Sequence, residues 1–379
     1  MEARVRVIML LGPSTGGIGT HVAQLSADLR ERGVEVVVVT HPLTAEHFDL
    51  GSSRLIWPGA AGRARGVRDV WALRRLAASA DIVHAHGHQG ALLATLATTG
   101  LPKGPRLIVS QHNAVLAGSG RQVLKRLSQG WVARRADLVT GASSDLVREA
   151  RAFGAGRAEL AEVPSPRVPH LLAARPSDSA GRARIRQALF TSYGPDLDSL
   201  ADSTAPLVVT ISRIARQKNL LALVQAASQL REACTWVVVG EGDPELLAQL
   251  RQQCRALGAP VHFVGSSTEI DQWLRGAEVF VLPSQWEARA LVVQEAMAAG
   301  TPVVAADVGG LHDLVLGTGL LVPPGDSGSI AKATDSILAD PGLREELAAH
   351  GRQVAAALPD GSDTVTRWLA WYSQTLAMT

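Results

Sequence analysis

The sequence has few of the features that would define its class at once. Only Cys234 and Cys254 are cysteines among 379 residues, so neither a disulfide framework nor a cysteine metal site is indicated. Aromatic residues make up 4% of the chain and no RNA- or DNA-reading motif is present, which argues against nucleic acid as a partner. No apolar run approaches the roughly 18 residues that cross a bilayer, and VRVIMLLG is too short for a signal-peptide core. We therefore expect a cytoplasmic protein.

Charge is unevenly divided along the chain. Residues 1–190 carry 25 Lys and Arg against 14 Asp and Glu, a balance of +11. The remaining residues carry 12 against 21, a balance of −9. A basic first half can attract an anionic acceptor or the inner face of a membrane, so peripheral membrane contact is one expectation. Codon bias toward arginine is the alternative, since 33 of the 37 basic residues are Arg.

The length and the hydrophobic rhythm predict two similar domains. A chain of 379 residues exceeds one typical core. Short β-branched runs alternate with amphipathic segments in both halves, which is typical of parallel βαβ units. We predict an α/β fold of two facing Rossmann-like, doubly wound domains (the architecture that binds ligand in a cleft at the carboxyl ends of its strands). The predicted strands are RVRVIMLL, VEVVVVT, DIVHAH, RLIVSQH and DLVTGAS, then PLVVTIS, TWVVVGEG, VHFVGS, EVFVLPS and TPVVAAD.

The alternation lapses in EVPSPRVPHLLAARPSDSAGRARIRQALFTSYGPDLDSLADSTAP, which is rich in Pro, Ser and Gly and holds one basic helical patch. Such composition is typical of a region between domains. We predict a first domain over residues 1–170, a linker region over 171–205 and a second domain over 206–362.

The closing segment SDTVTRWLAWYSQTLAM is predicted to form a helix. Trp368, Trp371 and Tyr372 cluster on it, and a face of that size needs a partner surface to cover it. We expect this helix, at about residues 363–379, to pack back on the first domain.

Each half places a Gly-containing turn where a strand enters a helix. The first turn, LLGPSTGGIGTHV, contains Gly17, and small residues let backbone N–H groups approach an anion at a helix start. Its glycines do not fit G-x-G-x-x-G, and the second strand ends in Thr40-His41 without the acidic residue that a dinucleotide's ribose needs. A dinucleotide fold is therefore not indicated. An ordinary tight turn remains the alternative to an anion site.

In the second half, two cations follow a strand in SRIARQKNLL. Arg213 and Lys218 suit a diphosphate, Arg through its planar fork and Lys as a compact point charge. An ordinary solvated loop is the alternative. The next strand leads into Gly240-Glu241-Gly242-Asp243-Pro244, where Gly240 and Gly242 can present backbone groups to a ligand or simply form a turn before Pro at the first helical position.

The stretch SQWEARALVVQEAMAAGTPVVA reads as an apolar helix that carries two glutamates. Glu287 and Glu295 are eight positions apart, which on a helix spans roughly 12 Å, so their carboxylates could hold two ends of one elongated ligand. Ser284-x-x-Glu287 also matches a capping box, and on spacing alone that interpretation is favoured. Glu295 could be a surface charge, although its apolar flanks make exposure unnatural.

Histidines and a basic helix complete the candidate features. His84, His86 and His88 alternate at strand spacing, but no carboxylate cluster or DXD-like motif accompanies them, so we predict no metal site. His112 ends a strand, where an isolated histidine is more often structural than catalytic. The segment GRQVLKRLSQGWVARRAD has one apolar side, which either packs into the first domain or rests on a membrane interface.

Together these motifs resemble the retaining family 4 glycosyltransferases of the GT-B fold (glycosyl transferases group 1). The resemblance rests on ISRIARQKN, VVVGEGDPELL, FVGS and VLPSQWEARALVVQEAMAAGTPVVAADVGG, and TGGIGTHV and DIVHAHG are similar to the family's first domain. It implies transfer of a sugar, with retention of anomeric configuration, from a UDP- or GDP-linked donor to a sugar, lipid-linked or small-molecule acceptor. It implies no metal and no cofactor. The second domain would bind the donor and the first the acceptor.

The resemblance also implies roles for single residues. Glu287 would contact hydroxyls of the donor sugar, and Glu295 those of the nucleotide's ribose. Arg213 and Lys218 would hold the diphosphate and stabilise it as it leaves. The remaining implied contacts come from Gly17 near the diphosphate or acceptor, His112 near the sugar, the turn with Gly240 and Gly242, and the helix start at Arg289, Ala290 and Leu291.

Two departures from the family pattern leave alternatives open. Ala288-Arg289-Ala290 stands where many members have a Gly-Phe-Gly-like run, which leaves the donor's identity open. Pro164-Ser165-Pro166 replaces the family's Pro-Asn-Gly turn between domains. A nucleotide-sugar epimerase of similar fold is the alternative enzyme, but its acid and base residues cannot be identified. A nucleotide-sugar-binding protein without catalysis is the non-enzymatic alternative.

Overall fold

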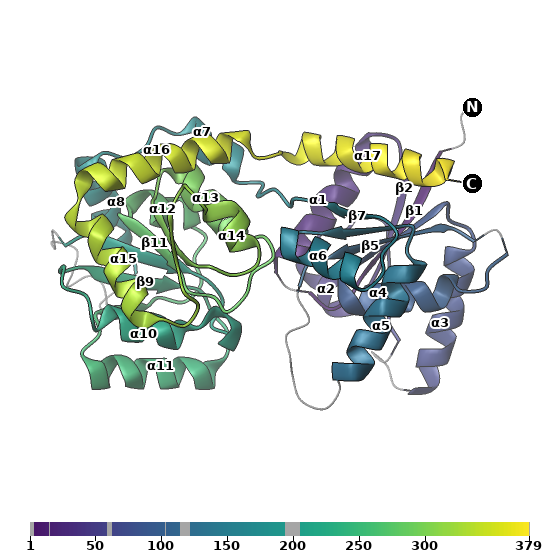
Figure 1. Cartoon of the computed structure of the whole chain (residues 1–379), viewed down its shortest axis with the longest axis horizontal. Helices are drawn as coiled ribbons and strands as arrows, with labels where there is room; N and C mark the ends of the chain where they lie inside the picture. The colour runs from purple at the N-terminus through teal and green to yellow at the C-terminus, as the bar shows by residue number, and fades with distance from the viewer. Residues whose placement is uncertain are drawn as a thin grey trace. The chain divides into compact units, whose positions relative to one another are not determined.

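The chain divides into two compact units, which we describe separately (Figure 1). The computed structural model describes residues 4–14, 16–58, 63–102, 104–113, 122–193 and 205–378, with side chains from 66 and from 126 in the segments that begin at 63 and 122. The first unit comprises Met1–Pro164 and Pro359–Thr379, and the second comprises Ser165–Leu358. Within the described residues, no helix is both long enough and apolar enough to cross a membrane.

The first unit contains a parallel sheet of seven strands in the order β3-β2-β1-β4-β5-β6-β7. All of its described strand pairs are parallel, as the βαβ rhythm predicts. The strands are β1 Arg6–Leu11, β2 Glu35–Thr40, β3 Ser53–Arg54, β4 Ile82–His86, β5 Arg106–Gln111, β6 Leu138–Gly141 and β7 Ala158–Leu160. The helices are α1 Gly17–Glu31, α2 Pro42–His47, α3 Arg63–Ala77, α4 Gly87–Thr98, α5 Gln122–Arg135, α6 Ser144–Ala152 and α17 Gly361–Ala377.

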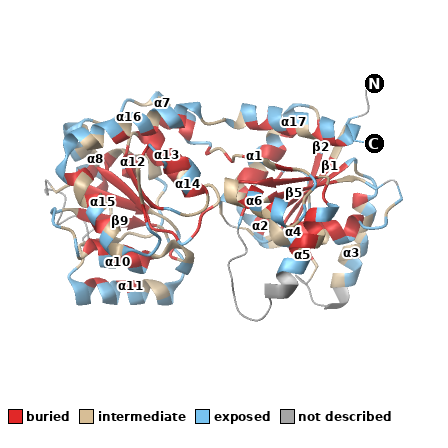
Figure 2. Cartoon of the chain, viewed as in Figure 1, coloured by how far each residue is buried: buried red, intermediate tan, exposed pale blue. Residues whose placement is uncertain are grey.

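Alternate residues of β1, β2, β4, β5 and β6 supply two cores, one on each face of this sheet, and these strands are largely buried (Figure 2). Ile8 and Leu10 of β1 face the core that α3, α4, α5 and α6 cover. Val7 and Met9 face the opposite core, against α1 and α17. Trp368 and Tyr372 of α17 are almost fully buried there. The aromatic face of this last helix is therefore part of the first unit's core.

The second unit contains a parallel sheet of six strands in the order β10-β9-β8-β11-β12-β13, again covered by helices on both faces. Its strands are β8 Leu207–Ile211, β9 Thr235–Val239, β10 Val261–Phe263, β11 Val279–Leu282, β12 Val303–Ala306 and β13 Leu320–Val322. Its helices are α7 Val168–Ala173, α8 Ser179–Ser192, the 3-10 turn η1 Arg216–Lys218, α10 Leu220–Ala227, α11 Pro244–Leu257, α12 Ile270–Gly276, α13 Leu291–Ala299, α14 Gly310–Val315, α15 Ser327–Ala339 and α16 Pro341–Ala357.

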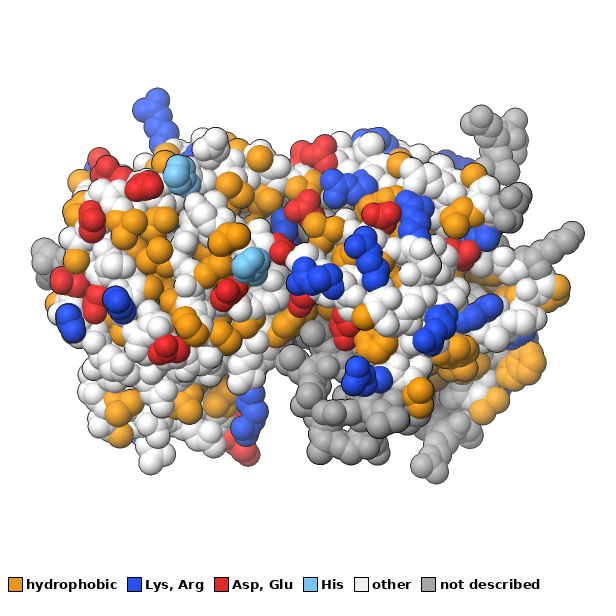
Figure 3. Space-filling view, in the orientation of Figure 1, with side chains coloured by type: hydrophobic (Ala, Val, Ile, Leu, Met, Phe, Trp, Pro, Cys, Tyr) orange, Lys and Arg blue, Asp and Glu red, His pale blue; other side chains and the backbone are white. Residues whose placement is uncertain are grey.

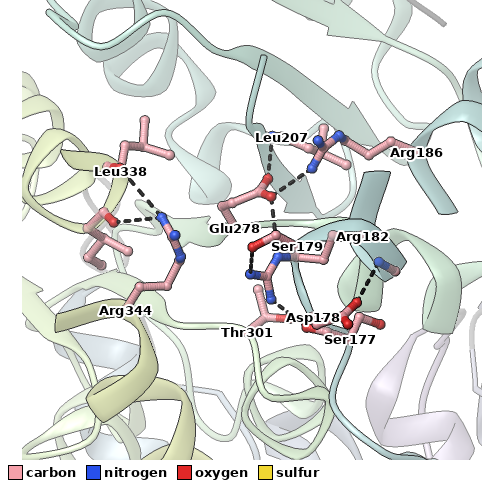
Figure 4. A network of polar contacts seen from close by, with 12 residues as sticks. Ser177, Asp178, Ser179, Arg182, Arg186, Leu207, Glu278, Thr301, Leu338 and Arg344 are labelled. Carbon is pink, nitrogen blue, oxygen red and sulfur yellow. Dashed lines mark hydrogen bonds and ion pairs between the residues drawn. The ribbon is translucent and has the colours of Figure 1, made fainter. Parts of the chain in front are cut away.

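The stretch predicted as a linker, 171–205, is structured where it is described and belongs to the second unit. The basic patch GRARIRQALF forms most of α8, which packs against α12. Arg186 on α8 binds Glu278 at 2.7 Å, and the other carboxylate oxygen of Glu278 accepts from the backbone N–H of Leu207 at 2.6 Å (Figure 4). This buried contact ties α8 to the first strand of the unit. Residues 194–204 lie outside the described residues.

Candidate functional site

Four loops of the second unit meet at one edge of its sheet. They follow β8, β9, β11 and β12, which are neighbours in the order β9-β8-β11-β12. Since all these strands are parallel, their carboxyl ends lie at the same edge. The strand order turns at β8, whose two neighbours are β9 and β11. Such a switch point is where open α/β sheets bind ligands, and every predicted site residue of this unit lies in these loops or on α13.

The two glycines after β9 allow the first two loops to touch. Gly240 has φ +141°, and a Cβ there would lie 2.0 Å from the carbonyl oxygen of Ser212. A Cβ on Gly242 would lie 2.2 Å from the carbonyl oxygen of Ile214, whose backbone pairs with this turn. Both clashes would be with backbone, which cannot move aside as a side-chain end can. These glycines therefore fix the loop that carries Arg213 against the turn before α11.

Lys218 and Glu287 form a largely buried ion pair between the loops after β8 and β11. The Lys218 Nζ lies 2.5 Å from Glu287 Oε1, and the side chains are 16% and 11% exposed. The hydroxyl of Ser284, which is fully buried, donates to the same oxygen at 2.6 Å. A carboxylate and a cation of the predicted donor site are thus in direct contact.

The helix predicted through both glutamates begins later than expected. Helix α13 starts at Leu291 with Ala290 as its N-cap, so Glu287 lies in the preceding loop and the helical spacing of the two glutamates does not apply. The capping-box interpretation of Ser284 and Glu287 is therefore wrong. The two residues instead share a side-chain hydrogen bond.

Tertiary contacts hold this loop away from a helical path. Gln217 accepts from the backbone N–H of Gln285 at 2.8 Å and donates to the carbonyl of Trp286 at 2.7 Å. The carbonyl of Glu287 accepts from the N–H of Gly310 at 2.8 Å. Gly309, with φ +49°, has no side chain to block this approach, since a Cβ there would lie 2.2 Å from that carbonyl.

Glu295 lies on α13 and is buried together with Ser165. Its carboxylate accepts from the Ser165 hydroxyl at 2.6 Å, and the neighbouring Gln294 accepts from the Ser165 backbone N–H at 3.2 Å. Burial raises the pKa of Glu295, and the Ser165 hydrogen bond opposes that rise. None of the described hydrogen bonds joins Glu295 to Lys218 or Glu287. The Pro-Ser-Pro turn thus supplies a direct partner to a predicted site residue.

Two further predicted groups are the exposed guanidinium of Arg213 and the backbone N–H groups at the start of α13. Arg213 is exposed, and no hydrogen bond or ion pair of its guanidinium is found among the described residues. Arg289 is half-buried and precedes the N-cap Ala290, which makes no side-chain cap hydrogen bond. The first N–H groups of α13, from Leu291, therefore have no side-chain acceptor at the cap position, as an anion-binding helix start requires.

In the first unit, the predicted Gly17 is the exposed first residue of α1, and His112 is buried just after β5. His112 Nε2 lies 3.1 Å from Nδ1 of His86. His21, one turn into α1, has its ring centroid 5.5 Å from that of His112. Burial lowers the pKa of His21 to about 4 and that of His112 to about 3, so both rings are neutral at pH 7.

Of the three histidines that alternate at strand spacing in the sequence, only His84 and His86 lie on a strand, β4. His88 lies on α4 instead of continuing β4. His84 and His86 share one face of β4, with ring centroids 4.2 Å apart. His21 was not predicted as a site residue, although it lies in TGGIGTHV. The 3.6-residue period of α1 turns it toward the sheet.

A cavity in the first unit lies beside the same β1–α1 turn. Its volume is about 440 Å³, and its lining includes Pro13, His41, Trp57, Gln89 and Leu92. An aromatic ring, an imidazole and an amide are groups that contact sugar rings and hydroxyls. The cavity thus offers the first unit a place for a small polar molecule.

Comparisons with known proteins agree with this geometry. The family model described as "Glycosyl transferases group 1" matches residues 205–340, and that described as "Glycosyl transferase 4-like domain" matches residues 16–166. A D-inositol 3-phosphate glycosyltransferase of Jonesia denitrificans is 30% identical over 95% of this chain and 91% of its own length. The chain belongs to the group 1 glycosyl transferases. It is a glycosyltransferase of family 4 type, and the glycogen synthase of Mycobacterium tuberculosis strain H37Rv is a further relative, 29% identical over 89% of this chain and 86% of its own length.

Solved structures of glycosyltransferases share the fold. Anabaena HepE in complex with UDP and glucose superposes with a TM-score of 0.80, over 98% of this chain and 100% of the other, at 19% identity. A sucrose-phosphate synthase from Thermosynechococcus elongatus gives a TM-score of 0.78 at 24% identity, covering 99% and 100%. The two parallel-sheet units of this glycosyltransferase are therefore those of the GT-B fold, as the sequence predicts.

Proposed function

We propose that the enzyme transfers a sugar from a nucleotide-diphosphate-sugar donor to an acceptor, with retention of anomeric configuration and without metal or cofactor. The observation that carries this proposal is the contact of Lys218 with Glu287 at the carboxyl ends of β8 and β11, where the loop after β8 also carries exposed Arg213. A cation and a carboxylate held together in this way match the two parts of such a donor, a diphosphate and a sugar rich in hydroxyls.

In this proposal donor binding separates the Lys218–Glu287 pair. Lys218 and Arg213 take the diphosphate oxygens, and the Glu287 carboxylate accepts hydrogen bonds from hydroxyls of the sugar. Negative charge grows on the diphosphate as the sugar leaves, so fixed cations there lower the barrier. They do the work that a divalent ion does in metal-dependent phosphate chemistry. The acceptor attacks from the same face as the leaving phosphate, which acts as its base.

Glu295, Gly17 and His112 complete the assignment as proposals. Glu295 binds the ribose hydroxyls, in exchange for its hydrogen bond with Ser165. Gly17 lets the donor or acceptor approach the start of α1, and His112 lies near the sugar. The cavity at Trp57 receives a sugar-like acceptor. UDP is the first nucleotide to test, because HepE, which shares the fold, is described with UDP-glucose.

The decisive experiment incubates the purified enzyme with a panel of UDP- and GDP-sugars, with a chelator and without acceptor. We expect slow nucleotide release from one donor, lost in Glu287→Ala and Lys218→Ala and kept in Lys332→Ala, an exposed lysine on α15 that serves as control. Conversion into a different nucleotide sugar would instead identify an epimerase. Donor binding without turnover, even with an acceptor panel, would identify a binding protein. The anomeric configuration of the product, read by NMR, tests retention.

We further propose that the first unit contacts the inner face of a membrane from the cytoplasm. Val67 and Trp71, one turn apart on α3, are 64% and 58% exposed, and Arg68 and Arg75 are exposed on the same helix. Lys and Arg side chains are spread over the visible face of this unit (Figure 3). Exposed tryptophan beside arginine suits an anionic interface.

Vesicle sedimentation tests this contact. We expect the enzyme to sediment with vesicles of 30% phosphatidylglycerol in phosphatidylcholine, and binding to fall in Trp71→Ser. Leu257→Ser, an exposed residue of the second unit, is the control and should bind as the wild type does. Equal sedimentation of all three proteins would rule out α3 as the contact.

The sequence also predicted a basic helix at GRQVLKRLSQGWVARRAD that could rest on a membrane. Arg121 and the side chains of Val123, Leu124 and Lys125 in this segment lie outside the described residues.

A further inference from the structure

Three buried histidines of the first unit converge from three separate elements. His21 comes from α1, His86 from the end of β4 and His112 from the residue after β5. They are 7%, 2% and 7% exposed. Each offers a ring nitrogen, and these three nitrogens all lie within 4.8 Å of one another. No carboxylate or thiolate belongs to the group, so its donors are imidazole nitrogens alone.

We propose that His21, His86 and His112 form a binding site for a late transition-metal ion such as Zn²⁺, Co²⁺ or Ni²⁺. Imidazole nitrogen is a preferred ligand of these ions, whereas Mg²⁺ and Ca²⁺ take oxygen ligands. Three protein ligands leave one tetrahedral position for water or another molecule. The bound ion takes no part in the transfer reaction proposed above.

The spacing of the nitrogens is close to what such an ion needs. Bonds of about 2.0–2.1 Å place tetrahedral ligand atoms roughly 3.3 Å apart. His86 Nδ1 and His112 Nε2 already lie 3.1 Å apart. The remaining closure, from at most 4.8 Å, can come from rotation of the His21 side chain on α1. Bringing the three nitrogens to metal-binding distance therefore requires a side-chain adjustment and no rearrangement of the sheet.

A fourth buried histidine, His84, lies next to the group but is not part of the proposed site. His84 has both ring nitrogens engaged, Nδ1 with the Tyr372 hydroxyl and Nε2 with Ser110 Oγ, each at 2.8 Å. By contrast, among the described residues His86 Nδ1 and His112 Nε2 have no hydrogen-bond partner but each other. An ion that replaces this one bond therefore takes no hydrogen bond from any other protein group.

Occupation of the site should inhibit the enzyme. This consequence, unlike metal binding itself, rests on the proposed function, in which His112 lies near the sugar and Gly17 begins the helix that carries His21. An ion that holds His21 and His112 together removes both from any contact with substrate. We therefore expect micromolar Zn²⁺ or Ni²⁺ to lower turnover and a chelator to restore it.

Direct binding is tested on the whole enzyme after treatment with a chelator. Titration with Co²⁺, followed by its visible absorption, should reach saturation at one equivalent with the intensity of a four-coordinate ion. His21→Asn and His86→Asn should each weaken binding at least about tenfold, since each removes a ligand. His350→Asn, an exposed histidine of the second unit, is the matched control and should leave the titration unchanged. Unchanged titration in both ligand variants, or absence of a Co²⁺ spectrum in the wild type, would overturn the proposal.

A second measurement needs no variant to fold. X-ray absorption of the Zn²⁺-loaded wild type should show imidazole nitrogens at about 2.0–2.1 Å, and a first shell of oxygen or sulfur alone would reject the site. Nucleotide-sugar binding is measured in parallel, because its predicted groups lie in the second unit. Co²⁺ binding without donor binding would uphold the metal site and reject the proposed function; the converse would do the opposite.

Discussion

Removing the Lys218 side chain should destabilise the second unit through the charge it leaves behind. In Lys218→Ala, the largely buried Glu287 carboxylate keeps only the Ser284 hydroxyl as a side-chain donor among the described residues. Breaking a buried ion pair costs roughly 3–5 kcal/mol, and partial exposure of this pair reduces the expected loss to about 2–3 kcal/mol. At about 2–4 °C for each kcal/mol, the unfolding midpoint of the unit should fall by about 5–10 °C.

A double variant, Lys218→Ala with Glu287→Gln, tests whether the unpaired Glu287 carboxylate causes the loss of stability. Glu287→Gln removes the stranded charge, so Lys218→Ala with Glu287→Gln should recover most of the stability lost in Lys218→Ala. Scanning calorimetry of the four proteins measures the coupling, and Lys332→Ala should unfold as the wild type does. Losses that simply add within about 0.5 kcal/mol would refute the argument, because contacting partners must couple. Activity should not recover in the double variant, since both groups are proposed to bind the donor.

Three further predictions concern backbone space and protonation. Gly240→Ala should abolish donor binding and destabilise far more than Gly258→Ala, because a Cβ on Gly258 meets open space and costs only about 1–2 kcal/mol for its positive φ; urea unfolding and nucleotide titration measure both. Burial raises the folded-state pKa of Glu295 above 4.5, so its ionisation destabilises the fold as pH rises past that value. Glu295→Gln should therefore be more stable than the wild type at pH 7, with a difference in urea midpoint that disappears below about pH 4. Because burial lowers the pKa of His21 from 6.5 to about 4, the unfolded chain takes up a proton first, and stability of the first unit should be lost as pH falls through that window. His21→Gln should reduce this dependence in acid-titrated unfolding curves, and an unchanged curve would contradict it.

Periodicity sufficed to predict most strands, because central parallel strands are long and apolar on both faces. It missed β3, β7 and β13, which have two or three residues and lie at sheet edges. Short edge strands carry too few residues for a period to appear, and pairing with a neighbour determines them. Helix α8 was expected as a basic helical patch, but its place in the second unit was not. That place rests on tertiary contacts such as Arg186–Glu278, between residues 92 positions apart.

The site shows the same division between local pattern and tertiary contact. Arg213, Lys218 and the glycines after β9 could be found from residue type and from position after a strand. The path of the loop around Glu287 could not, because Gln217 and Gly310 hold it through hydrogen bonds from distant segments. Serine and glutamate three apart favour a cap in isolation, and here tertiary bonds outweigh that local preference.

The burial of α17 in the first unit has a consequence for synthesis of the protein. Tyr372 and His84 are 288 positions apart, and the whole second unit is translated between Pro164 and Pro359. At about 5–20 residues per second, those 194 residues take roughly 10–40 s on a ribosome. During that interval the sheet face later covered by Trp368 and Tyr372 is open in the nascent chain, while the second unit can complete its own core. The unit that is translated first is therefore finished last, and its open face is where a chaperone would be needed.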